Sequence, residues 1–147
     1  MEIHPVQGYD TIPFYNFCID VPELQVSSNE PFMHEQEFSS AVDHPDSTMF
    51  LAEDGGQIVG FIYARVGDID RVISTKCACI VYLAVDPAHQ RQGIAQRLYE
   101  ECVRALTAKG VTDVYCWANT DSPAVMDFMK KQGLQAGKTC IWMDGKI

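Results

Sequence analysis

The pattern of apolar and polar positions alternates between stretches typical of strands and of helices. A short stretch at residues 2–6 predicts a first strand, and residues 9–21 and 31–42 carry apolar residues at roughly helical spacing, with Pro13 and Pro31 near their starts. Two β-rich runs, TMFLAED and QIVGFIYARV, flank the turn at residues 54–56 and predict a hairpin. The run CACIVYLAV predicts a central strand, apolar on both faces and covered on both.

The second half of the chain continues the alternation. A long helical stripe begins at Gly93 and reaches about residue 109, where Gly110 ends it. DVYCWA predicts another strand, SPAVMDFMKKQ a helix with Ser122 as N-cap, and LQAG and TCIWMD two terminal strands. The predicted order is β-α-α-β-β-β-α-β-α-β-β, a mixed α/β fold with a largely antiparallel sheet. Because no repeat or linker divides the 147 residues, we expect one domain spanning residues 1–147.

Composition and charge restrict the functions that fit. Twenty acidic and eleven basic side chains give a net charge of −9, which argues against general nucleic-acid binding. The start MEIHPVQGYD shows no leader peptide, and no apolar run is long enough to cross a bilayer, so we expect a cytoplasmic protein that does not bind membranes. The six cysteines form no CxxC pair and have no His partners at metal spacing, which predicts reduced thiols and no metal site.

The stretch VDPAHQRQGIAQRLY places a polar run between the central strand and the long helix. If the helix begins near Gly93, the backbone amides from about Arg91 to Gln96 have no helical partners and carry partial positive charge. Arg91 adds a full charge, while Gln90 and Gln92 add neutral donors. The stretch lacks GxxxxGK[ST] and GxGxxG, so a magnesium-free pyrophosphate, such as that of coenzyme A, stays open. The alternative is a solvated loop that leads into an ordinary helix.

A family resemblance narrows these options. The segment LAVDPAHQRQGIAQRLYEECV resembles the acetyl-CoA-binding segment of the GNAT N-acetyltransferase superfamily. That family's signature, [Q/R]-x-x-G-x-[G/A], is met by Gln90, Arg91, Gln92, Gly93, Ile94 and Ala95. The element order agrees over nearly the whole chain, and residues 77–134 carry the specific part of the likeness. The resemblance implies that a primary amine attacks the acetyl carbon of acetyl-CoA directly.

The resemblance also implies how the co-substrate lies. The central strand would splay from the next strand, and the pantetheine arm would enter the gap and pair with the backbone of Leu83 and Val85. The amide of Leu83 would polarise the thioester carbonyl as an oxyanion donor. The cofactor-binding residues implied in this way are Leu83, Ala84, Val85, Gln90, Arg91, Gln92, Gly93, Ile94, Ala95, Gln96, Asn119 and Met129.

The chain departs from the family at the residues that move protons. Many members have a Tyr four residues before the Gly that ends the last helix, and Met129 holds this place here. A thioether donates no proton. Many members also carry a Glu on one of the two splayed strands, and neither CACIVYLAV nor DVYCWA contains one. Two alternatives stay open for Tyr82 and Tyr115: either could serve as a substitute acid, or both are core residues. Two also stay open for Asn119: it binds a water or a pantetheine amide, or it stabilises a turn.

Three functions therefore stay open: an N-acetyltransferase, an acyl-CoA-binding sensor or regulatory module of the same fold, and an interaction protein without a ligand. The acceptor of the enzyme would be a small-molecule or protein amine. Its cationic character is suggested by the carboxylates of residues 21–46, for which a hydrated helix face is the alternative. The resemblance also leaves a homodimer open, with TCIWMDGKI taking part. The carboxylates are Glu23, Glu30, Glu35, Glu37, Asp43 and Asp46.

Overall fold

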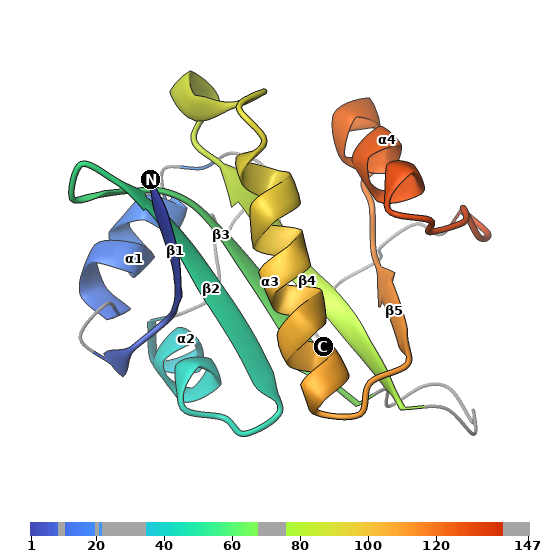
Figure 1. Cartoon of the computed structure of the whole chain (residues 1–147), viewed down its shortest axis with the longest axis horizontal. Coiled ribbons are helices and arrows are strands. Elements are labelled where there is room, and N and C mark those ends of the chain that lie inside the picture. The colour runs from blue at the N-terminus through green and yellow to red at the C-terminus, as the bar shows by residue number, and fades with distance from the viewer. Residues whose placement is uncertain (9–10, 20, 22–34, 68–75, 140–147) are drawn as a thin grey trace, which may run out of the picture. The chain divides into compact units, whose positions relative to one another are not determined.

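The computed structural model describes residues 1–8, 11–19, 21, 35–67 and 76–139. They fall into two compact units, Met1–Cys116 and Trp117–Ile147. The first unit holds a five-stranded sheet in the order β1-β2-β3-β4-β5 (Figure 1). The first three pairings are antiparallel, and β4 and β5 run parallel. The strands are β1 (Glu2–Pro5), β2 (Ser47–Asp54), β3 (Gln57–Val66), β4 (Cys77–Val85) and β5 (Asp113–Cys116).

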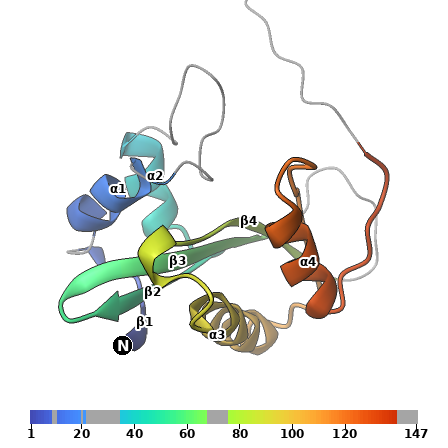
Figure 2. The same cartoon turned by 90° about the horizontal axis from the view of Figure 1, so that it is seen from above.

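Helices cover both faces of this sheet. Figure 2 shows α1 (Thr11–Ile19) and α2 (Glu35–Val42) on one face and α3 (Ile94–Ala108) on the other. On the first face, the ring of Phe14 lies 4.7 Å from that of Phe38 and 4.4 Å from that of Phe61, both edge-on. On the second face α3 approaches β3 closely at Gly60, where a Cβ would lie only 3.3 Å from side-chain atoms of Ile94 and Leu98.

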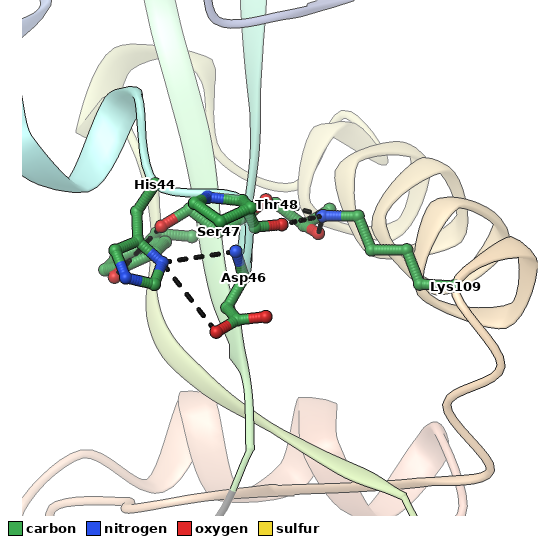
Figure 3. A network of polar contacts seen from close by, with 7 residues as sticks. His44, Asp46, Ser47, Thr48 and Lys109 are labelled. Atoms are coloured by element: carbon green, nitrogen blue, oxygen red, sulfur yellow. Dashed lines mark hydrogen bonds and ion pairs between the residues drawn. The ribbon is translucent and has the colours of Figure 1, made fainter.

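A lysine anchors the C-terminal end of α3. The Nζ of Lys109 donates to the carbonyl oxygens of Pro45 (3.2 Å) and Ser47 (2.7 Å) and to Oγ1 of Thr48 (3.0 Å) (Figure 3). An ammonium group has three N–H bonds, so all its donors are used. A second lysine, Lys76, donates from Nζ to the carbonyl of Lys109 at 2.7 Å. Positive charge at this helix end also suits the helix dipole, and the contacts fix α3 against the start of β2.

The second unit contains α4 (Pro123–Lys131), which is described here by itself. Ser122 is the N-cap, as its place before Pro123 predicts, although its side chain makes no capping hydrogen bond. The helix ends before Gly133, whose φ of +91° is a left-handed value that glycine adopts at little cost. Within the described ranges, no helix is both long and apolar enough to cross a bilayer.

The mixed α/β fold, the hairpin and the long helix are confirmed, with corrections at the edges. The strand expected at residues 134–137 is wrong, because these residues join no ladder in the described part of the chain, and a strand exists only where its backbone groups are paired. The strand DVYCWA ends at Cys116 rather than Ala118. Residues 9–10, 20, 22–34 and 140–147, which include most of the last expected strand, lie outside the described residues.

Candidate active site

A β-bulge separates the paired part of β4 from its open part. Along β3 and β4, Tyr63 lies opposite Tyr82 but Ala64 lies opposite Ile80, so Val81 is an extra residue in β4. A bulge bends its strand and increases the local twist. The pairing of β4 with β5 ends at the same place, at Ile80, while β4 continues to Val85 (Figure 1). The ladder between the two strands thus ends at the bulge, where β5 itself ends, and the splay of the two strands beyond this point stays a prediction.

The register shows which backbone groups reach the open edge beyond the bulge. The N–H of Asp86 donates to the carbonyl of Val59 at 2.9 Å, so these residues form a hydrogen-bonded pair. Such pairs alternate along an antiparallel ladder. Ala84 therefore bonds to β3, whereas Leu83 and Val85 turn their N–H and C=O groups away from β3. Of the three residues expected to line the pantetheine arm, only Leu83 and Val85 present backbone groups to this edge.

A short 3₁₀ helix, η3 (Pro87–His89), follows β4 and is capped by Asp86. Oδ1 of Asp86 accepts from the N–H of Ala88 at 3.2 Å, and Oδ2 accepts from Nδ1 of His89 at 2.6 Å. The hydrogen bond from His89, followed by that from Ala88, lowers the pKa of Asp86 below its ordinary value, so the carboxylate stays ionised at neutral pH. The turn is held by a charge-assisted contact.

The loop that follows has an unusual backbone. Arg91 has a φ of +60°, which is uncommon for a residue with a side chain, and Gly93 has a φ of +79°. A Cβ on Gly93 would meet nothing within 4 Å, so the space above this residue is open. Gln90, the residue before Arg91, is extended, so one extended and two left-handed residues lie in the loop that leads into α3.

The side chain of Gln90, expected to be a donor for a ligand, already donates a hydrogen bond within the protein. Its Nε2 donates to the carbonyl of Val85 at 3.2 Å, which ties the loop back to the open edge of β4. The side-chain Nε2 of Gln90 has a second N–H, and the backbone carbonyl of Val85 has a second lone pair. Both groups therefore keep capacity for a ligand.

The N-terminus of α3 has no cap of its own. Its first i→i−4 hydrogen bond runs from the N–H of Arg97 to the carbonyl of Gly93 at 3.1 Å, so the amides of Ile94 and Ala95 lie before the helical ladder begins. The first turn contains no acidic residue, and no side chain caps it. The exposed Arg91 forms no ion pair with any described residue. This end of α3 is positive within a chain of net charge −9 and is suited to an anion.

Two expected site residues belong to the second unit. The Oδ1 of Asn119 accepts from the N–H of Asp121 at 2.9 Å, and its carbonyl accepts from the N–H of Ser122 at 3.0 Å. These contacts are the turn chemistry that was the alternative for Asn119. Met129 is buried. Roles for Asn119 and Met129 toward a cofactor stay predictions.

The buried thiols of Cys18 and Cys102 and the half-buried thiol of Cys116 supply no nucleophile. Burial raises the pKa of Cys102 to about 12, and burial also raises the pKa values of Cys18 and Cys116. All three thiols are therefore protonated at neutral pH. Burial likewise raises the pKa of Tyr99, whose hydroxyl keeps its proton. A covalent acyl intermediate on any of these cysteines is disfavoured.

Among the described residues, the part of β4 beyond the bulge carries no carboxylate. The acidic residue of β5, Asp113, is exposed and lies opposite Cys77, at the start of β4 and away from the bulge. A hollow of about 230 Å³ lies at the C-terminal end of α3, with Val6, Phe50 and Lys109 among its lining residues. It is at the opposite end of that helix from Gly93 and forms no part of this site.

Sequence analysis missed three features of the site, although one of them has a sequence signal. The bulge at Val81 had no signal, because the whole run CACIVYLAV is apolar. The left-handed backbone of Arg91 had none either, since arginine does not favour it. The cap at Asp86 did have a signal: Asp followed by Pro is a common start of a helical turn.

The comparisons with known proteins identify a family and a fold. The model of the acetyltransferase (GNAT) family matches residues 15–134. The fold is similar to an aminoglycoside acetyltransferase, meta-AAC0020, from an uncultured soil metagenomic sample, solved in complex with sisomicin (22% identity, 99% of this chain and 95% of that chain, TM-score 0.76). It is also similar to the aminoglycoside 6'-N-acetyltransferase AAC(6')-IG from Acinetobacter haemolyticus (17%, 100% and 99%, 0.80).

A third similar structure, the aminoglycoside N-acetyltransferase AAC(6')-Iy, was solved in complex with CoA (14% identity, 99% of this chain and 95% of that chain, TM-score 0.79). At these identities the likeness shows a shared fold. No curated protein sequence gives a significant match to the chain.

Proposed function

The chain belongs to the GNAT acetyltransferase family, and we propose that it transfers the acetyl group of acetyl-CoA to a primary amine by direct attack. One observation carries the proposal: the uncapped, positive N-terminus of α3 follows the open edge of β4 after only the short 3₁₀ turn and the loop of residues 90–93. An anion site and an unpaired strand edge in succession suit a ligand that has a diphosphate at one end and an amide-containing arm after it.

In this proposal the diphosphate of CoA lies on the amides of residues 91–95. The open space above Gly93, the absence of a cap and the unpaired charge of Arg91 support this placement. The pantetheine arm lies along β4 and bonds to the backbone groups of Leu83 and Val85, as an added strand would. The N–H of Leu83 then donates to the thioester carbonyl and stabilises the negative charge that develops during attack.

The residues of this chain would accelerate the reaction mainly by positioning. A lysine-like amine has a pKa of about 10.4, so fewer than about one molecule in a thousand is uncharged at pH 7. Its proton leaves to water, since no described strand residue near the bulge is a carboxylate. A CoA thiol, with a pKa near the 8.5 of cysteine, leaves as a thiolate without a dedicated acid. The remaining rate acceleration comes from holding the two reactants together and from polarising the thioester carbonyl.

We further propose that the acceptor is a cationic amine. The aminoglycoside acetyltransferases of similar fold act on small molecules of this kind, and Glu35, Asp43 and Asp46 are exposed acids in the described part of residues 21–46. Of the other acids, Glu23 and Glu30 lie outside the described residues, and so does the side chain of Glu37. Changing the exposed acids to amides should raise the KM for the amine at low salt and leave the KM for acetyl-CoA unchanged.

A thiol-release assay tests the proposed activity. Purified protein and acetyl-CoA are mixed with a panel of amines: an aminoglycoside, a polyamine, an amino sugar and a lysine peptide. Amine-dependent release of CoA thiol is the expected result. Binding of CoA without turnover of any amine would favour the acyl-CoA-binding module, which Met129 in place of a tyrosine also favours. An unchanged Tm in excess CoA would leave only an interaction protein.

A further inference from the structure

Asp86 places a negative charge next to the loop that would hold a diphosphate. Three residues separate it from Gln90, whose side chain ties that loop to β4. Like charges repel, so a carboxylate here opposes anion binding on electrostatic grounds alone. The contacts of Asp86 explain its presence.

Every polar group of Asp86 is engaged. Its N–H donates to Val59 of β3 at 2.9 Å, and its carbonyl accepts from the N–H of His89 at 2.8 Å. Its two carboxylate oxygens accept from the N–H of Ala88 at 3.2 Å and from Nδ1 of His89 at 2.6 Å. One residue thus joins the sheet, the 3₁₀ turn and the imidazole ring.

The turn leads directly into the left-handed backbone at Arg91. A residue with a side chain pays a free-energy cost for a φ of +60°, so the neighbouring contacts must hold it there. Both such contacts precede Arg91: the hydrogen bond between Asp86 and His89 within the turn, and the hydrogen bond from the Gln90 side chain to the carbonyl of Val85. These two contacts tie the start of the loop to the 3₁₀ turn and to the end of β4.

We propose that Asp86 is a positioning residue that, through His89 and the N–H of Ala88, holds residues 90–93 in the conformation that binds the diphosphate. The ligand named here rests on the proposed function. The role of Asp86 in the loop conformation rests on the contacts alone. The two parts can therefore be tested separately.

The direction in which one substitution changes the Kd for CoA distinguishes a positioning role from an effect of charge. In Asp86→Ala a negative charge disappears from beside the anion site, so an effect of charge alone would tighten CoA binding. Positioning predicts the opposite: a Kd for CoA about tenfold higher by calorimetry, which corresponds to about 1.4 kcal/mol. The KM for acetyl-CoA should rise by a similar factor while kcat at saturation changes little.

Two further variants complete this test. Asp86→Asn keeps an oxygen for the N–H of Ala88 and should recover part of the affinity. Asp113→Ala removes the same charge at the other end of β4, opposite Cys77, and should leave the Kd unchanged. Equal or tighter CoA binding by Asp86→Ala would overturn the proposal.

A measurement without ligand keeps the two proposals distinct. The N–H groups of Ala88, His89 and Gln90 are hydrogen-bonded within the turn, and their hydrogen exchange should become faster in both Asp86 variants, more so in Asp86→Ala. Unchanged exchange would overturn the positioning role whether or not CoA binds. Faster exchange in a protein whose wild type binds no CoA would support Asp86 as the support of the loop and refute the proposed function.

Discussion

Two glycines at opposite ends of α3 allow backbone strain to be separated from anion binding. Gly93 precedes the helix and Gly110 follows it, and each has a φ of +79°. At either position a Cβ would meet nothing within 4 Å, so alanine adds no clash. The left-handed backbone destabilises it by about 1 kcal/mol. For a chain of this length that corresponds to a fall in Tm of about 2–4 °C. We expect Gly93→Ala and Gly110→Ala to be destabilised equally.

The two variants should differ in CoA affinity, measured by calorimetry below the Tm of both. A methyl group on Gly93 enters the space where the diphosphate would approach the amides, and losing one charge-assisted hydrogen bond, worth about 1.5–3 kcal/mol, raises Kd about tenfold or more. Gly110→Ala should keep the wild-type Kd. Gly93→Asn sharpens the test, since asparagine tolerates this backbone but is larger, so it should lose less stability and more affinity. Equal Kd values for the two alanine variants would refute the placement of the diphosphate at Gly93.

Three other expectations follow from contacts elsewhere in the first unit. Gly60→Ala would place a Cβ 3.0 Å from the carbonyl oxygen of Ala84, and this overpacking should cost about 1–3 kcal/mol in urea unfolding; an unchanged midpoint would contradict the close packing. Lys109→Met keeps the apolar stem but leaves three oxygens without their donor, so we expect a loss of about 1 kcal/mol with CoA affinity unchanged. In an NMR titration, the pKa of Asp86 should lie below the ordinary value of about 3.9, and it should rise in His89→Ala. The stability that the Asp86 carboxylate contributes is complete above the ordinary pKa and is lost as the pH falls through the lowered pKa.

The elements that the sequence predicted well are those with a local signal. The hairpin has two β-rich runs around a glycine pair, and α3 has a long apolar stripe between two glycines, so both were placed within a few residues. The strand expected at residues 134–137 was wrong because its apolar residues say nothing about a partner. Pairing is a property of the whole sheet, and a short apolar run can lie unpaired.

The same distinction applies to the site: features with a local sequence signal were predictable, and features that depend on the assembled sheet were not. The helix N-terminus at Gly93 was predictable, since a glycine without a capping side chain before an apolar stripe marks unpaired amides. The tie from Gln90 to Val85 was not, because it joins a loop to a strand edge that exists only once β4 has left β5. The left-handed backbone of Arg91 depends in turn on that tie and on the turn capped by Asp86.

The bulge and the loop act together because β4 connects them. Before the bulge, the N–H of Gly67 donates to the carbonyl of Cys77, so Ala78 and Ile80 direct their backbone groups toward β5. The extra residue, Val81, shifts this alternation, and beyond it Leu83 and Val85 face the open edge. The loop is fixed to the same strand end through Gln90 and Asp86. The distance from the anion site to the N–H of Leu83 is therefore set by the strand itself. In the proposed function, a fixed distance would let a thioester arm of constant length deliver its carbonyl to one place, so that positioning would serve where the strands lack the family's usual acid and base.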